Sequence, residues 1–185
     1  MIERLIVAGF GGQGIVFLGR LLADAMMHEG RNVTCLPAYG PEVRGGWANC
    51  HVIISSDEIC SPAVTRPSAL IAMNQISWDH FSPRLEPDGL AVVNASMATA
   101  CAASPSQRIL PVAATDIANE LGDVRATNMV MLGAYNHARG LLAVDALLGH
   151  LRAALGPQKA GLFGLNQQAV QRGIEAAAAA LRSSS

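Results

Sequence analysis

The sequence predicts an α/β protein in which a mostly parallel β-sheet has flanking helices and is followed by a helical C-terminal part. Three observations lead to this prediction. Residues 3–37 follow the order strand, glycine turn, helix, strand. Further short apolar runs, each the length of a strand, recur between residues 48 and 112. From residue 115 onward the apolar residues have helical spacing instead.

The N-terminal part predicts a β-α-β unit. Glu3–Ala8 holds a short apolar run that stops at Gly9, as is typical of a buried strand. Apolar residues recur with helical spacing over Gln13–Glu29, and Gly30 is the expected residue after the helix end. Asn32–Pro37 is the second expected strand. Such a unit predicts parallel strands with a right-handed crossover, and therefore a Rossmann-like fold.

The remaining elements follow from apolar runs and from their glycine and proline boundaries. Further strands are expected at Ala48–Ser55, Ala69–Met73, Leu90–Asn94 and Ile109–Val112. Helices are expected over Trp78–Leu85 (a short one at best), from Thr115 or Asp116 to Leu121, and over Thr127–Arg139, Val144–Leu155 and Asn166–Arg182. No repeat or linker interrupts this pattern, so we expect residues 1–185 to form a single domain.

Composition and charge exclude several classes of protein. The net charge of −1, from 13 basic and 14 acidic residues, argues against a nucleic-acid binder. The sequence has neither an apolar run of the ~18 residues that a membrane span needs nor a signal-peptide pattern. We therefore expect a cytoplasmic protein without a membrane partner. Only 15% of residues are charged, against about 25% in typical domains, which fits either an alanine-rich chain or a surface covered by partner subunits.

The cysteines and histidines carry no recognisable metal or hydrolase motif. Cys35, Cys50, Cys60 and Cys101 form no C-x-x-C pair, so their spacing fits neither a zinc site nor an iron–sulfur cluster. They are expected to be reduced thiols. The five histidines are scattered, and H-E-x-x-H, G-x-S-x-G and P-loop motifs are missing from the sequence.

The first candidate site is the glycine turn Gly9-Phe10-Gly11-Gly12-Gln13-Gly14, which matches G-x-G-x-x-G between a strand and a helix. An NAD site would also require a carboxylate at the tip of the second strand, but Pro37–Gly40 has none and Glu42 comes three residues late. Two other interpretations remain open. The glycines either allow close helix–sheet packing only, or bring the backbone against an anion or a partner chain.

The second candidate is the glycine-rich segment that follows the second strand, Tyr39-Gly40-Pro41-Glu42-Val43-Arg44-Gly45-Gly46. It leaves the carboxyl end of that strand, where open α/β sheets place their binding crevice. The guanidinium of Arg44 could bind a carboxylate or phosphate with two hydrogen bonds. Alternatively, Glu42 and Arg44 pair with each other and only fix the loop.

Amide side chains add a polar element to the same predicted edge. Asn49, Asn74, Gln75 and Asn94 fall at or just past strand ends. An amide there can bind a polar ligand, or it can act as a turn residue that bonds to the loop backbone. We take Asn49 and Asn74 as candidate binding residues.

Together these motifs resemble the gamma subunit of 2-oxoacid:ferredoxin (acceptor) oxidoreductases. The resemblance extends from Ile2 to about Gln167. Within the family, the sequence is most similar to the 2-oxoglutarate type and also resembles the branched-chain 2-oxoacid type. It is carried by Gly-Phe-Gly-Gly-Gln-Gly, by Tyr39-Gly-Pro-Glu-Val-Arg-Gly-Gly, by Ser61-Pro62 through Arg66-Pro67, and by Ala72-Met73-Asn74-Gln75.

The resemblance implies a part in the CoA-acylating oxidative decarboxylation of a 2-oxoacid, which for 2-oxoglutarate yields succinyl-CoA. In this family, thiamine diphosphate with magnesium and the iron–sulfur clusters belong to other subunits, here called alpha and beta, and electrons pass to ferredoxin or another acceptor. This chain is expected to bind none of these cofactors alone, but to help form the access region for CoA and substrate. The alternatives are a stand-alone Rossmann-like nucleotide-binding protein and a lid without ligand contacts.

We expect the site residues that the resemblance implies to lie closest to that access region, at the carboxyl edge of the sheet. They are Gly11, Gly12, Gln13, Gly14, Tyr39, Glu42 and Arg44.

Overall fold

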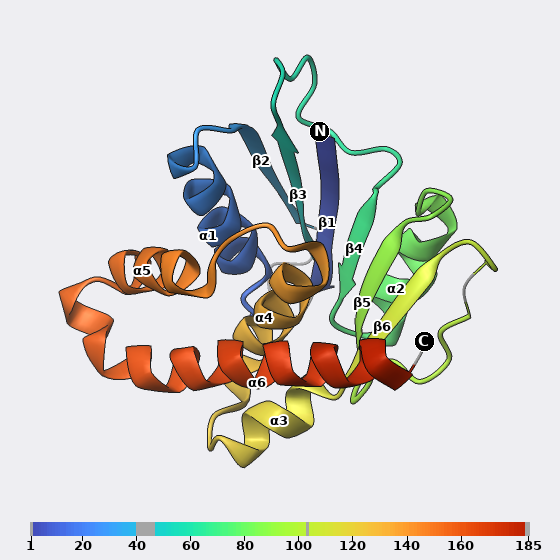
Figure 1. Cartoon of the computed structure of the whole chain (residues 1–185). Coiled ribbons are helices and arrows are strands. Elements are labelled where there is room, and N and C mark those ends of the chain that lie inside the picture. Colours follow the sequence, from blue (N-terminus) through green and yellow to red (C-terminus); the bar gives the residue numbers. More distant parts are fainter. Residues whose placement is uncertain (1, 40–46, 103, 184–185) are drawn as a thin grey trace.

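A six-stranded sheet forms the centre of the structure, a computed structural model that describes residues 2–39, 47–102 and 104–183 (Figure 1). The strands are β1 (Ile2–Phe10), β2 (Asn32–Tyr39), β3 (Trp47–Ser55), β4 (Ala69–Ala72), β5 (Leu90–Asn94) and β6 (Arg108–Val112), in the order β2-β3-β1-β4-β5-β6. The α-helices are α1 (Ile15–His28), α2 (Gln75–Phe81), α3 (Ala114–Glu120), α4 (Thr127–Arg139), α5 (Val144–Leu155) and α6 (Phe163–Ser183). Short 3₁₀ helices are η1 (Ser82–Arg84), η2 (Val124–Ala126) and η3 (Pro157–Leu162).

The expected α/β fold with a mostly parallel sheet is confirmed, with one correction to the strand order. Strands β1, β4, β5 and β6 are parallel neighbours. Between β1 and β2, however, lies β3, which is antiparallel to both. The N-terminal β-α-β unit therefore does not pair its two strands directly. Strand β3 is largely buried in this inner position, whereas half-exposed β2 lies at the edge.

Four helix starts differ from the expected ones. Gly14 has a φ of 73°, which is left-handed backbone, so α1 begins at Ile15, two residues later than expected. Helix α3 begins at Ala114, before either of its two expected starts. Helix α2 begins earlier than expected, because the Asn74 side chain accepts a hydrogen bond from the Ser77 N–H and caps it. Helix α6 begins at Phe163, directly after η3.

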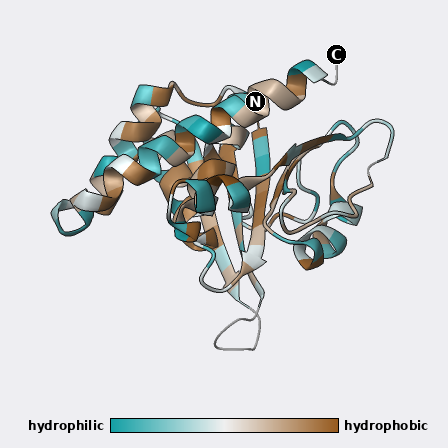
Figure 2. Ribbon diagram, turned by 90° about the horizontal axis from the view of Figure 1, so that it is seen from below, coloured by the Kyte–Doolittle hydropathy of each residue, from teal (hydrophilic) through white to brown (hydrophobic). Residues whose placement is uncertain are grey.

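Two apolar cores lie on opposite faces of the sheet. Helices α1 and α4 contribute to the larger core, whereas α2 contributes to the smaller one. Helix α4 is buried from Thr127 to Asn136, as the small and apolar residues in its sequence predict. Helix α6 alternates between hydrophilic and hydrophobic segments along its length (Figure 2). It buries only a stripe that includes Val170, Gly173 and Ala177.

Two glycines let α4 and α6 cross with their backbones in contact. A Cβ atom added at Gly133 of α4 would overlap the carbonyl group of Val170. A Cβ atom at Gly173 of α6 would overlap the carbonyl group of Val130. Since a carbonyl within a helix cannot rotate away, any larger side chain at either position must push the helices apart.

A buried polar group joins the start of β1 to the C-terminal part of α4. The hydroxyl of the fully buried Tyr135 donates to Oε1 of Glu3 at 2.8 Å. The Nε atom of Arg139 lies 3.0 Å from the same oxygen, and its Nη2 donates to the Ser68 carbonyl. Burial and the neighbouring Glu3 carboxylate raise the pKa of Tyr135 well above its usual value, so the hydroxyl stays protonated and continues to donate.

Both edge strands of the sheet contain a proline. Pro37 lies within β2 and Pro111 within β6, whereas the four inner strands contain none. Proline has no N–H to donate to a neighbouring strand, so it is tolerated in a sheet chiefly at the edges. The two prolines therefore agree with the observed strand order.

The crossing of α4 and α6 predicts a strong asymmetry between two glycine substitutions. Gly133→Ala should lower the free energy of unfolding by about 1–3 kcal/mol, because the new methyl group overlaps backbone. Gly149→Ala in α5 is the matched control, since a Cβ there meets open space, and it should raise the free energy of unfolding by up to ~1 kcal/mol. Urea unfolding of both variants measures the difference. Equal stability of the two would contradict the backbone contact.

Candidate functional site

The described candidate residues gather at one edge of the sheet. Strand β1 continues past the expected stop at Gly9 to Phe10, so the glycine turn overlaps its end. Asn74 follows the end of β4. Tyr39 ends β2. Asn49 lies near the start of β3 but opposite Ala8 near the end of β1, because β3 runs in the opposite direction. The edge formed by the carboxyl ends of the parallel strands is where open α/β sheets bind ligands.

Two further candidates, Glu42 and Arg44, lie outside the described residues. Strand β2 ends at this edge and β3 begins there, since Tyr39 is paired with Ala48. Arg44 therefore remains a candidate by its place in the sequence alone.

Gln13 and Asn74 are joined by a hydrogen bond and shape the edge together. The Oε1 atom of Gln13 accepts from the backbone N–H of Phe10 at 2.7 Å and from Nδ2 of Asn74 at 3.3 Å. The Oδ1 atom of Asn74 accepts from Ser77 at the start of α2. Both side chains thus hold the glycine turn against α2, which is the turn role that the sequence left open for Asn74.

The glycines of the turn leave the N-terminus of α1 open. Gly12 and Gly14 have φ angles of 93° and 73°, in the left-handed region that favours glycine. A Cβ at Gly14 would overlap the amide of Asn128, whose Nδ2 donates to the Gly14 carbonyl. Within the described part of the chain, α1 has no side-chain cap. The N–H groups of its first turn remain available for an acceptor.

A cavity of about 240 Å³ lies beside this turn. Backbone of the glycine turn and apolar side chains form much of its wall, and Lys159, Arg125 and Asn166 supply polar groups. Lys159 is the only lysine in the sequence, and no ion pair involves it among the described residues. The full lining consists of Gly12, Gly14, Phe17, Asp123, Arg125, Ala126, Asn128, Leu155, Lys159, Leu162, Leu165 and Asn166.

The charge of this cavity is positive on balance. Arg125 holds Asp123 through several hydrogen bonds, the shortest 2.6 Å from Nη2 to Oδ2. These side-chain hydrogen bonds, and then the one from the Arg125 backbone, lower the pKa of Asp123 to about 2. Arg125 therefore neutralises the Asp123 carboxylate, and Lys159 adds a second positive charge. The arrangement suits an anion such as a phosphate group.

This part of the site was not predicted from the sequence. Arg125, Lys159 and Asn166 come from η2, η3 and α6, more than a hundred residues after the glycine turn. No local motif joins them to it. The single lysine, two residues after Pro157, was the one unusual feature in the sequence.

Asn49 has an unsatisfied side-chain oxygen. Its Oδ1 atom is buried and finds no hydrogen-bond donor among the described residues. Leaving a buried acceptor unpaired costs about 1–3 kcal/mol. Nearby, Tyr39 and Trp47 are 69% and 41% exposed. This end of β2 and β3 therefore offers exposed aromatic surface together with one acceptor that lacks a donor.

The histidines and Asn94 near this edge have structural roles. The Nδ1 atom of His51 accepts from the backbone N–H of Val64 at 3.0 Å. Burial, and then the charge of Arg84, lowers the pKa of His51, so its ring is neutral. Trp47 packs edge-on against His80, with ring centroids 4.4 Å apart. The Asn94 amide donates to the Met73 carbonyl and to the Thr115 hydroxyl, which ties two loops together.

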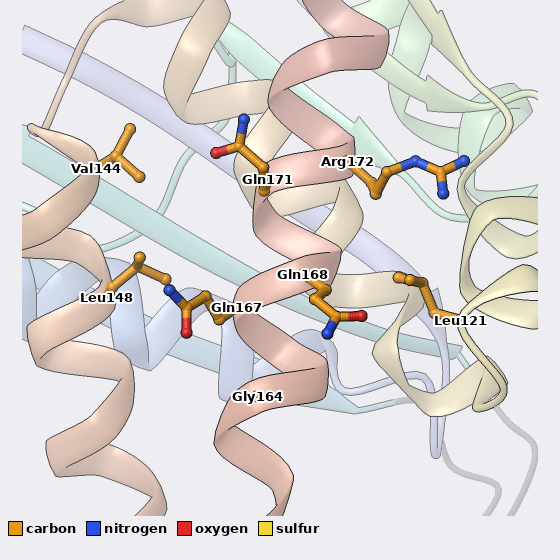
Figure 3. A pocket seen from close by; sticks show the side chains of 8 residues that line it. All are labelled: Leu121, Val144, Leu148, Gly164, Gln167, Gln168, Gln171 and Arg172. Carbon is orange, nitrogen blue, oxygen red and sulfur yellow. The ribbon is translucent and has the colours of Figure 1, made fainter.

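A second hollow, of about 540 Å³, lies along α6 on the outer side of the helical layer (Figure 3). Gln167 and Gln171 point toward α5, whereas Gln168 and Arg172 lie on the side of Leu121. Arg172 is paired with Glu120. The lining of this hollow includes none of the predicted site residues. It also includes no aspartate, glutamate, histidine or cysteine, so it offers no side chain suited to act as a general acid, base or nucleophile.

Metal-ligating side chains are not clustered in the part of the chain that the structure describes. Among those residues, no three histidines, cysteines or acids lie close enough to hold a metal ion. Among the helices of the described ranges, none combines the length and the hydrophobicity of a membrane span.

Comparison with known proteins identifies the relatives of this chain. The VorA subunit of the ketoisovalerate oxidoreductase of Methanothermobacter thermautotrophicus is 42% identical over 142 residues, which are 77% of this chain. The chain spans only 29% of that relative's length. The 2-oxoglutarate synthase subunit KorC of the same organism is 32% identical over 180 residues and 94% of both chains. The indolepyruvate oxidoreductase subunit IorB of Archaeoglobus fulgidus and the pyruvate synthase subunit PorC of Methanosarcina barkeri are less similar, at 28% and 26% identity.

A solved structure agrees with these relatives. The keto/oxoacid ferredoxin oxidoreductase gamma subunit from Geobacter sulfurreducens PCA has a TM-score of 0.82 and 28% identity, over 96% of this chain and 99% of the other. The family model described as pyruvate ferredoxin/flavodoxin oxidoreductase matches residues 4–176. The chain therefore belongs to the pyruvate ferredoxin/flavodoxin oxidoreductase family, in agreement with the resemblance to gamma subunits that its motifs carry.

Proposed function

We propose that this chain is the gamma subunit, or gamma-type domain, of a CoA-acylating 2-oxoacid:ferredoxin oxidoreductase, and that it helps form the access region for CoA and substrate. The position of the glycine turn beside the Lys159 cavity is the observation that supports a role in the access region. Backbone N–H groups at the open end of α1 and a net positive cavity provide what a phosphate group of CoA requires. A cavity of about 240 Å³ is large enough for part of such a ligand only.

The role of the chain in this proposal is binding and positioning. Thiamine diphosphate and the iron–sulfur clusters supply the carbanion and electron-transfer chemistry when bound. The described residues of this chain offer no ligands for them, so alpha and beta subunits would hold them and would pass electrons to ferredoxin or another acceptor. Gly11 and Gly12 let a ligand approach the backbone, and Gln13 and Asn74 fix the shape of the turn.

A stand-alone NAD-binding protein is less well supported. In a Rossmann dinucleotide site, the strand beside β1 is parallel to it and ends in a carboxylate that binds the ribose. Here antiparallel β3 occupies that place, and β2 ends in Tyr39. Neither the topology nor the residue type fits the ribose contact.

The acid that we propose as substrate is 2-oxoglutarate, with a branched-chain 2-oxoacid as the second candidate. Similarity to KorC over 94% of both chains supports the first. The higher identity to VorA over a shorter segment supports the second. Both are 2-oxoacids, so the two candidates need the same chemistry and differ only in the side chain of the substrate.

The proposal predicts that a tagged copy, isolated without oxygen from its source organism, purifies with larger subunits and with visible iron–sulfur absorbance. The complex should release carbon dioxide from 2-oxoglutarate only when CoA is present. Mass spectrometry, the absorption spectrum and rates with 2-oxoglutarate and 3-methyl-2-oxobutanoate are the measurements. A colourless chain that purifies alone would contradict the subunit assignment, whereas faster turnover of the branched-chain acid would change the substrate only.

The proposal predicts that loss of either candidate cation weakens substrate affinity. Lys159 lines the cavity, and Arg44 is a candidate from the sequence alone. Lys159→Ala, and separately Arg44→Ala, should raise the apparent KM of the complex for CoA or for the 2-oxoacid about 10- to 100-fold, because each removes a hydrogen bond to a charged group worth ~1.5–3 kcal/mol. Arg182→Ala, at the exposed end of α6, is the control for loss of one charge. Unchanged KM values in both variants would show that these cations have only structural roles.

The unpaired oxygen of Asn49 predicts that one substitution will affect stability and activity differently. Asn49→Leu removes a buried acceptor that has no donor in the described chain, so the free energy of unfolding should stay the same or rise by ~1 kcal/mol. If a ligand or partner donates to this oxygen, the assembled enzyme should lose activity at the same time. Chemical unfolding and steady-state rates measure the two effects. A variant that is less stable but fully active would refute this role for Asn49.

A further inference from the structure

Two cysteines on neighbouring strands place their thiols in contact. The Sγ atoms of Cys35 in β2 and Cys50 in β3 lie 3.4 Å apart. Their positions are offset by two residues in the ladder, since Cys35 is opposite Val52 and Cys50 is opposite Pro37. Both side chains belong to the core on the α1 face of the sheet. A disulfide requires an S–S distance of about 2.05 Å, so the sulfurs would need to approach by about 1.4 Å.

The opposite wall of this thiol pair is a glycine. A Cβ atom added at Gly19 of α1 would lie 2.5 Å from Sγ of Cys50. The missing side chain therefore makes the space that the Cys50 sulfur occupies. Cys50 is fully buried, whereas Cys35 is partly exposed on the edge strand, so a small oxidant can reach the pair through Cys35.

The two thiols differ in acidity. The thiol that reacts first with an oxidant must be the one that forms a thiolate more easily. The hydrogen bond with Cys50, and to a lesser degree the nearby charge of Arg20, lower the pKa of Cys35 to about 7, against the opposite effects of burial and of Asp24. The hydrogen bond to Cys35 and burial raise the pKa of Cys50 instead. The partly exposed Cys35 thus forms the thiolate more easily and reacts first. Cys50 gives up its proton when it reacts in the second step.

We propose that Cys35 and Cys50 form a redox modification site, at which a peroxide oxidises the thiol pair to a reversible cross-strand disulfide. The Cys35 thiolate attacks one oxygen of hydrogen peroxide, the O–O bond breaks, and the leaving hydroxide takes up a proton to form water. The sulfur of Cys50 then attacks the sulfenic acid on Cys35 and forms the S–S bond. The Cys50 proton and the sulfenic hydroxyl leave as a second water. The two thiols lose two electrons together, and one peroxide is reduced to two waters.

The remaining cysteines lack this arrangement. Cys60 is exposed, and neither it nor Cys101 has a sulfur neighbour among the described residues. Burial, and then the nearby Asp79, raises the pKa of Cys101. Peroxide should therefore select the Cys35–Cys50 pair. The product would link the two strands that lead into and out of the segment with Glu42 and Arg44, and the proposal does not depend on what that segment binds.

The test uses the full-length Cys60→Ser, Cys101→Ser double variant, which keeps only the proposed pair. After reduction and dilute hydrogen peroxide, its mass should fall by about 2 Da, the loss of two hydrogens, and dithiothreitol should restore it. Tryptic cleavage after Arg31, Arg44 and Arg84 separates the two cysteines into peptides 32–44 and 45–84. These peptides should stay joined only without reductant. The matched control, Cys35→Ser with Cys50→Ser, should give no internal link under the same conditions.

The chemistry of the first step gives a second measurement. The oxidation rate should rise with pH through about 7, because the reactive form of Cys35 is the thiolate. Arg20→Gln should slow the reaction at pH 7 roughly twofold, since the loss of the positive charge disfavours the thiolate. Gain of 16 or 32 Da without a peptide link would overturn the proposal. So would oxidation of Cys60 in the native chain as fast as that of Cys35.

Discussion

The backbone contact between α4 and α6 at Gly133 and Gly173 determines how the rest of the molecule is packed. It brings α6 down onto α4, which is then buried along most of its length against the sheet. The burial gives α4 the rigidity with which it holds both ends of β1. Asn128 in its first turn bonds to the glycine turn after β1, and Tyr135 near its other end bonds to Glu3 at the start of β1. The central strand is thus fixed at both ends by one helix.

This fixed strand supports the glycine turn that presents backbone groups at its end. The turn has no side-chain cap for α1 within the described residues. Its shape is held by its own Gln13, by Asn74 before α2 and by Asn128 in α4. The adjoining cavity is completed by η2, η3 and α6. The site is therefore a product of tertiary packing, although its most recognisable residues are contiguous in the sequence.

The sequence was sufficient for the parts of the fold that depend on local patterns. Apolar runs located all six strands, and the buried character of α4 followed from its small and apolar residues. The insertion of β3 between β1 and β2 could not be predicted, because the crossover pattern alone does not decide which strand pairs with β1. The capping role of Asn74 was left open for a similar reason, since an amide after a strand can serve a turn or a ligand. Lys159 and Arg125 join the site only through long-range packing, which carries no short-range signal.

The prolines of the two edge strands have a consequence for self-association. An open sheet edge normally offers a row of N–H and C=O groups to which a foreign strand can add, and such addition underlies edge-to-edge aggregation. Pro37 and Pro111 each lack an N–H group, one in each edge strand of the sheet. Prolines in edge strands are one of the devices that disfavour growth of a sheet from one molecule into the next. Contacts with other chains are left to side-chain surfaces, where specificity for the correct neighbour is easier to encode than in a backbone that every protein shares.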